Sequence, residues 1–109
     1  MGLYEQANPT TATGDGTAGT AGAAEVTAPV ATTVDVFYDV AATSDDIKIE
    51  GSTDGSNWRE LDETVNSGSV TTGGDVVSVT TAYETVRAYA GSGFADGDVT
   101  TIELTAKGL

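Results

Sequence analysis

The stretch that decides the fold of this chain runs from residue 47 to residue 61 and reads IKIEGSTDGSNWREL. Ile47 and Ile49 alternate with charged residues, which is typical of a strand with one buried face. An Asp-Gly pair follows at Asp54 and Gly55, and glycine tolerates the positive φ of a tight turn. A second strand would then open with Trp58. The stretch therefore predicts a β-hairpin in which Trp58 folds back as a lid on the core.

The same two-residue period continues on both sides of this hairpin. Apolar and polar side chains alternate in four further segments, at residues 34–40, 77–79, 86–90 and 102–106. Clusters of glycine, serine, asparagine and aspartate separate the segments and are typical of turns. An apolar stripe with helical spacing appears nowhere. Several short strands at this spacing predict an all-β protein, a single antiparallel β-sandwich of the jelly-roll kind.

At the hairpin the chain resembles the discoidin-like, or galactose-binding-like, jelly-roll sandwiches, in which a strand, an STDG-x-x-W turn and a second strand recur. Two later stretches extend the resemblance. Residues 85–90 read TVRAYA and are similar to that family's strand with an apolar-Arg-apolar alternation. Residues 101–108 read TIELTAKG and are similar to its closing strand. The resemblance covers about residues 34–108, with the motifs in the family's order.

This resemblance implies structural roles for four residues: Trp58 in the core, Asp54 and Gly55 as turn formers, and Arg87 as a strand residue. Members of the family bind sugars or lipid headgroups through long loops at one end of the sandwich, and this chain lacks the length for such loops. If Arg87 faced a pocket, it would be a ligand residue for a sugar hydroxyl or a carboxylate. The alternative, which we favour, is that Arg87 pairs with an acidic residue on the next strand.

Composition changes near residue 24. Residues 7–24 contain four glycines and no large apolar side chain, so alone they would not offset the entropy lost on ordering. We therefore expect an extended, flexible N-terminal arm over residues 1–24 and a sandwich domain over residues 25–109. Leu3 and Tyr4 lie near the tip. They favour an arm that orders against a neighbouring subunit over a simple leader.

The inventory of reactive side chains argues against catalysis. The chain contains neither histidine nor cysteine, which excludes a Ser-His-Asp triad, an imidazole or thiolate metal ligand and a thiol nucleophile. Carboxylate pairs that cleave glycosidic bonds lie in deep clefts, and a chain of 109 residues is too short to build much of one. We therefore expect a binding or structural protein and no enzyme.

Acidic residues outnumber basic ones by seventeen to four, and the net charge is −13. This charge repels nucleic acid and anionic membranes, so we expect neither as a partner. The acids are scattered through the folded region, lysine is scarce, and small residues replace bulky apolar ones. Such a composition favours a protein of concentrated salt, where the Debye length falls to about 3 Å and repulsion between carboxylates is screened.

The sequence shows no targeting or membrane segment. No run of about eighteen apolar residues is present to cross a bilayer. Residues 1–6 read MGLYEQ and lack the basic region and apolar stretch of a secretory signal. We therefore expect synthesis in a host cytoplasm without a signal peptide and without membrane insertion.

Calcium is the one cofactor for which ligands are present. Asp96 and Asp98 lie on either side of a glycine, and further aspartates at positions 45, 46 and 54 fall in predicted turns. The spacing matches no EF-hand, and Asp/Gly turns are also common in acidic proteins of concentrated salt. We expect no cofactor, with calcium at Asp96 and Asp98 as the alternative.

Three functional hypotheses remain. The first is a structural virion protein, a capsid decoration, turret or tail-associated subunit that assembles with itself and with capsid or tail proteins. In composition and layout the chain resembles small virion proteins of tailed viruses that infect halophilic archaea. A core of few, small residues agrees with this hypothesis, because association would add stability. The second hypothesis is a carbohydrate-binding module of discoidin-like fold, and the third is an enzyme of the carboxylate type.

Overall fold

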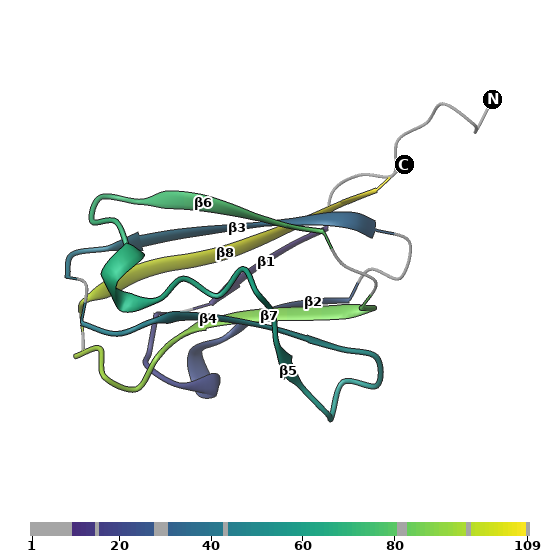
Figure 1. Cartoon of the computed structure of the whole chain (residues 1–109), viewed down its shortest axis with the longest axis horizontal. Coiled ribbons are helices and arrows are strands. Elements are labelled where there is room, and N and C mark those ends of the chain that lie inside the picture. Colours follow the sequence, from purple (N-terminus) through teal and green to yellow (C-terminus); the bar gives the residue numbers. More distant parts are fainter. Residues whose placement is uncertain are drawn as a thin grey trace.

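Two four-stranded antiparallel sheets pack face to face in this protein (Figure 1). The structure is a computed structural model that describes residues 10–14, 16–27, 31–42, 44–80, 83–95 and 97–108. The strands are β1 (Thr10–Gly14), β2 (Ala24–Thr27), β3 (Ala31–Val40), β4 (Ile47–Ser52), β5 (Arg59–Glu60), β6 (Asp75–Thr80), β7 (Thr85–Ala90) and β8 (Val99–Gly108). Two 3-10 helices, η2 (Thr20–Gly22) and η3 (Ser67–Ser69), complete the elements of the described ranges.

The strand order is that of a jelly roll. The first sheet runs β1-β8-β3-β6 and the second runs β2-β7-β4-β5. The pairs β1 with β8, β2 with β7, β3 with β6 and β4 with β5 are nested, as they are when one long antiparallel ribbon is rolled into two sheets. The predicted fold class, a single antiparallel β-sandwich, is confirmed.

Inward-facing residues of both sheets form the core, and they are the apolar residues of the predicted alternation. On β3, for example, Val34, Val36, Tyr38 and Val40 are buried, whereas Phe37 is exposed. The hydroxyl of Tyr38 accepts a hydrogen bond from the backbone N–H of Thr71 at 3.0 Å, so its polar end is satisfied inside the sandwich. The buried residues of β4, β7 and β8 alternate in the same way. No helix among the described residues has the length and apolar character needed to cross a bilayer.

The N-terminal region departs from the sequence-based expectation. Strand β1 lies within the predicted arm of residues 1–24, and it pairs along its whole length with residues 102–106 of β8. Gly14 and Gly22 are buried against each other, and a Cβ on Gly14 would clash with the carbonyl oxygen of Gly22. The segment is ordered by backbone hydrogen bonds and close backbone packing, neither of which needs large apolar side chains. The predicted arm was therefore wrong for residues 10–14 and 16–24, while Leu3 and Tyr4 lie outside the described residues.

Candidate functional site

One group of outward-facing side chains lies on the second sheet and consists of Lys48, Glu50, Trp58, Arg87 and Tyr89, here called the Trp58 face. Glu50 on β4 and Arg87 on β7 are directly opposite each other in the register. Nε and Nη2 of Arg87 donate to Oε1 of Glu50 at 2.8 and 2.7 Å, and the Tyr89 hydroxyl donates to Oε2 at 3.0 Å. Burial, and then this hydrogen bond, raise the pKa of Tyr89. Both carboxylate oxygens of Glu50 are therefore held.

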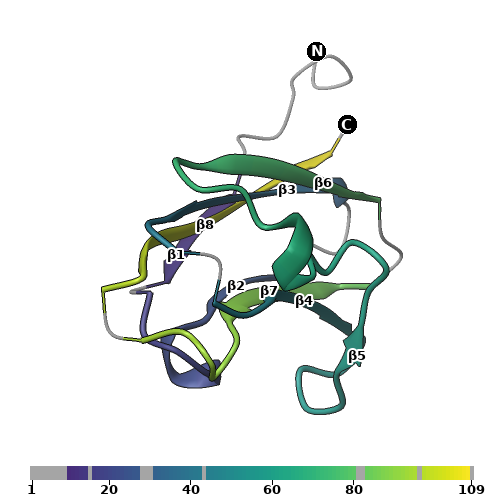
Figure 2. The same ribbon diagram turned by 60° about the vertical axis from the view of Figure 1, so that its left-hand side comes forward.

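The indole of Trp58 stacks on this ion pair. The Arg87 Cζ lies 4.0 Å from the centroid of the Trp58 ring and 5.4 Å from that of Tyr89, which are cation–π geometries. Trp58 is half-buried and does not belong to the core, so its prediction as a core lid was wrong. The physical reason is the path of the hairpin: the turn and β5 project away from the plane of the second sheet (Figure 2). The indole therefore packs on the outward-facing guanidinium of Arg87 on β7.

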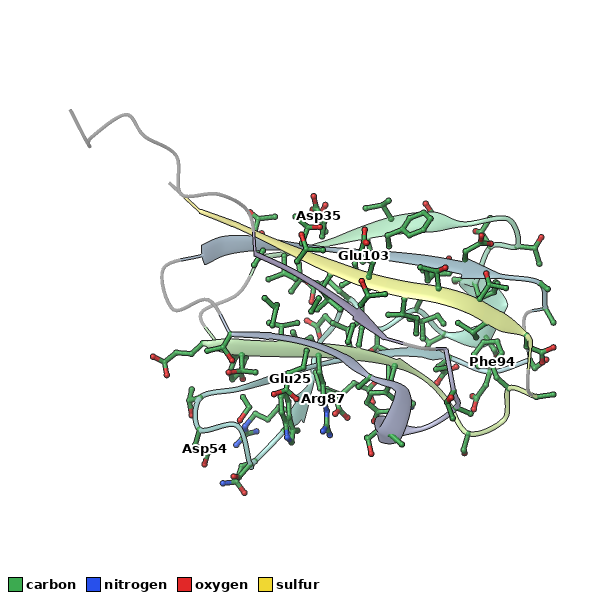
Figure 3. All side chains as sticks on the ribbon, turned by 180° about the vertical axis from the view of Figure 1, so that it is seen from behind. Glu25, Asp35, Asp54, Arg87, Phe94 and Glu103 are labelled. Carbon is green, nitrogen blue, oxygen red and sulfur yellow. The ribbon has the colours of Figure 1, made fainter. Side chains whose placement is uncertain are left out.

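Acidic and basic side chains form a row across the same face. The register places Glu25 of β2 beside Arg87, with Glu60 of β5 beyond the β4 strand, and Figure 3 shows Glu25 and Arg87 on one outer side. Lys48 Nζ lies 3.3 Å from Asp46 Oδ2 and 3.8 Å from Glu60 Oε1. The hydrogen bond to Asp46 raises the pKa of Lys48. Lys48 and Arg87 are thus engaged by neighbouring acids, so this face presents ion pairs.

The turn that leads into Trp58 is organised by the carboxylate of Asp54. Its Oδ1 accepts the backbone N–H groups of Ser56 and Asn57, both at 2.8 Å, and its Oδ2 accepts the side-chain amide of Asn57 at 2.6 Å. These bonds, that of the Asn57 N–H foremost, lower the pKa of Asp54. Gly55 follows with a φ of 77°. The turn-forming roles predicted for Asp54 and Gly55 are confirmed, as is the pairing of Arg87 with an acid on the next strand.

A second outward-facing surface, here called the Phe37 face, consists of Asp35, Phe37, Val76 and Ser78 on strands β3 and β6 of the first sheet. Phe37 and Val76 are directly opposite each other and are 37 % and 53 % exposed, and among the described residues they are the large apolar side chains left in solvent. Beside them Ser78 donates its hydroxyl to Asp35 at 2.8 Å. Residues 64–83, which include β6, carry a single charge, at Asp75.

In the described part of the chain, the aspartates considered for calcium accept hydrogen bonds from backbone N–H groups through their carboxylates. Asp98 accepts the N–H of Ala95 at 2.9 Å and the hydroxyl of Ser44 at 3.2 Å, whereas Asp96 lies outside the described residues. Asp45 accepts the N–H of Gly93 at 2.7 Å, and this bond lowers the pKa of Asp45. No three acidic side chains of the described ranges converge to hold a metal ion.

Sequence reasoning missed the partners that complete these two surfaces. Glu50 and Tyr89 each alternate outward in a predicted strand, but which of them meets Arg87 depends on a register between strands 37 residues apart in sequence. Val76 was missed because the predicted strand began at Val77. Its signal was the stretch of residues 64–83, which carries a single charge in an otherwise acidic chain.

Comparison with protein-family models, with curated proteins and with solved structures finds no match to this chain.

Proposed function

We propose that this chain is a non-enzymatic structural subunit of a virus particle from a halophilic host, and that it acts by protein–protein assembly. The observation that carries the proposal is the Phe37 face. An aromatic ring and a valine lie exposed side by side next to the edge of a sheet, and the valine belongs to residues 64–83, which carry a single charge. The cores of protein interfaces are enriched in aromatic residues and depleted of charged ones.

The fold and the composition are compatible with this role. Eight-stranded jelly rolls include viral capsid domains and lectin domains, but one fold serves many functions, so the fold alone decides nothing. The scattered acids, scarce lysine and small core residues support a protein of concentrated salt. Capsid or tail proteins are the partners that we propose, as decoration, turret or tail-associated contacts.

The direct test is the protein composition of particles. Particles of the virus whose genome encodes this chain, purified in molar salt, should contain its peptides at a constant ratio to the major capsid protein by mass spectrometry. Replacing Phe37 by serine should lower that ratio, because the exposed ring is lost without removing a core residue. Thr11→Ser, on the far margin of the same sheet, is the matched control and should leave it unchanged. If the wild-type chain is missing from purified particles, the proposal fails.

One observation favours a second candidate, a carbohydrate-binding module. Trp58 lies outside the core beside Arg87, Tyr89 and Glu50, and an aromatic ring with hydrogen-bonding groups around it fits the apolar face and the hydroxyls of a pyranose. The net charge favours a neutral sugar over an acidic one.

Calorimetric titration with neutral oligosaccharides in molar salt tests this candidate. Trp58→Ala should abolish binding while the circular dichroism spectrum is retained, and Trp58→Phe should retain part of it because a ring remains. If the wild-type protein binds none of these sugars at millimolar concentration, or if Trp58→Ala binds as well as the wild type, the Trp58 face is a structural cluster and this second candidate is excluded.

A further inference from the structure

We infer that two copies of this chain pair through strand β6, antiparallel and about a two-fold axis at Ser78, to form one continuous eight-stranded sheet. The inference rests on the proposed function, since it names one assembly partner: a second copy of the chain, paired at the β6 edge beside the Phe37 face. Three observations on the described residues carry it: the open backbone of β6, its hydrogen-bonding direction and its distribution of charge.

Strand β6 is an edge strand of the first sheet, whose order is β1-β8-β3-β6, as Figure 2 shows. Proteins usually protect an exposed edge strand from further pairing by keeping it very short or by placing lysine, proline or a β-bulge in it. The six residues of β6 contain no lysine or proline, and their register with β3 is continuous. No backbone hydrogen bond from the other described residues covers the far side of β6. The free edge of β6 is therefore able to pair with another strand.

The direction of the outward backbone groups of β6 follows from Val76. Its N–H is bonded to the side chain of Asp75 at 2.8 Å, so it does not point toward β3. Because N–H and C=O groups of alternate residues point to the same side of a strand, Ser78 and Thr80 also present their backbone groups outward. An axis at Ser78 makes three hydrogen-bonded residue pairs: Val76 with Thr80 of the second copy, Ser78 with Ser78, and Thr80 with Val76. In the pair, the Thr80 carbonyl takes the place of the Asp75 carboxylate on the Val76 N–H. An axis at Val77 would make only two such pairs.

The same register suits the side chains. Val77 opposes Val79 of the second copy on the inner side, so the partly exposed Val77 would extend the apolar core across the junction. Asp75 falls outside the three pairs and does not face its own copy. Two chains of charge −13 repel each other over most orientations, whereas residues 64–83 bring a single acid to the contact. This distribution favours a second copy over a basic partner.

Sedimentation equilibrium in molar salt tests for the pair. The wild-type chain should show a monomer–dimer equilibrium, and a monomer mass at every concentration up to the solubility limit overturns the inference. Ser78→Pro should weaken dimerisation by about tenfold or more, because proline removes an outward N–H and a strand margin tolerates it. Val76→Glu should do the same by adding like charge, while Thr11→Glu, on the opposite margin of the sheet, should not. A dimer that persists in both β6 variants also overturns it.

Cysteine crosslinking tests the axis, and the natural absence of cysteine keeps the experiment clean. Ser78→Cys places two thiols directly opposite each other, so a short bis-maleimide should link them rapidly. Val76→Cys, also exposed but two residues from the axis, places its thiols roughly 13 Å or more apart and should link poorly. Equal linking of both variants contradicts the axis. A chain found in particles but monomeric in solution refutes the pairing and leaves the proposed function standing. A chain that dimerises but never enters particles refutes the proposed function and leaves the pairing standing.

Discussion

Arg87 is the residue through which the outer side of the second sheet is organised. Its guanidinium bonds Glu50 from the adjacent strand, stacks on Trp58 and lies near the ring of Tyr89, which in turn donates to the same carboxylate. The Arg87 and Glu50 side chains are only 19 % and 15 % exposed, so they are less screened than a surface pair. Packing of Trp58 on this ion pair, and not burial in the core, sets the energetic role of its indole.

We therefore expect Trp58→Ala to destabilise the protein by about 1–2 kcal/mol, in the range of a partly desolvated cation–π contact, and to leave it folded. Urea unfolding in molar salt measures the change. Leu104→Ala is the control, because Leu104 is fully buried and its truncation should cost about 2–5 kcal/mol. A loss for Trp58→Ala as large as that of the control would show that the indole acts as a core residue after all.

Asp54 should give the turn a measurable pH dependence. Its pKa lies below its ordinary value of 3.8 in the folded state, chiefly because of the backbone N–H of Asn57. A lowered folded pKa means stability that is present above the ordinary pKa and is lost as the pH falls through the folded value. The stability advantage of the wild type over Asp54→Asn should therefore be constant near neutral pH and shrink below about pH 3.8. Urea unfolding at a series of pH values measures this difference. If the difference in unfolding free energy between the wild type and Asp54→Asn is the same at every pH, the explanation is wrong.

At the scale of elements, the N-terminal strands show that a jelly roll can include strands with few large apolar side chains. Strand β1 is rich in threonine, contributes no large apolar side chain, and still covers one margin of β8 along five residue pairs. Strand β2 covers β7 with Ala24 and Val26 buried. Their loss would uncover the margins of two central strands, one in each sheet.

Deleting residues 1–24 should consequently unfold the protein or lower its melting temperature strongly, because β1 and the start of β2 are removed. Deleting residues 1–9 is the matched truncation. It removes Leu3 and Tyr4 but keeps every described β1–β8 pair, so the melting temperature should change little. Circular dichroism melting in molar salt compares the two. If the longer deletion melts like the full chain, the pairing of β1 contributes nothing to stability. If the shorter deletion enters particles as well as the full chain, Leu3 and Tyr4 have no part in assembly.

At the scale of the whole molecule, acidic residues lie on the outer sides of both sheets. Figure 3 shows Asp35 and Glu103 on the outer side of the first sheet and Glu25 on that of the second. Three ion pairs among the described residues use only Lys48 and Arg87, so most of the seventeen acids remain uncompensated. The compact state concentrates their repulsion relative to the unfolded chain.

The melting temperature should therefore rise steeply between dilute buffer and molar potassium chloride, where screening acts within about 3 Å. Sucrose is the control, since it strengthens burial without screening charge, and it should give a smaller rise. A melting temperature that is unchanged or lower in molar salt would remove the argument for a protein of concentrated salt.

Much of this architecture could be predicted from local patterns in the sequence. Alternation along residues 34–40, 47–50 and 102–106 determined which side chains face the core, because a strand sends successive side chains to opposite faces. The Asp-Gly turn determined the hairpin, since Asp54 accepts hydrogen bonds from its own neighbours and Gly55 adopts a positive φ. These features depend on residues close together in the chain.

Only the tertiary structure decided which strands form the edges of the sheets and which residues are paired between neighbouring strands. Strand β1 is ordered by pairing with a strand about ninety residues away in sequence, so a rule that counts apolar side chains missed it. Trp58 lies outside the core because the hairpin bends away from the sheet, which neither its turn nor its apolar character specifies. Register and the path of a hairpin depend on contacts between distant segments, and those contacts form only when the whole sandwich does.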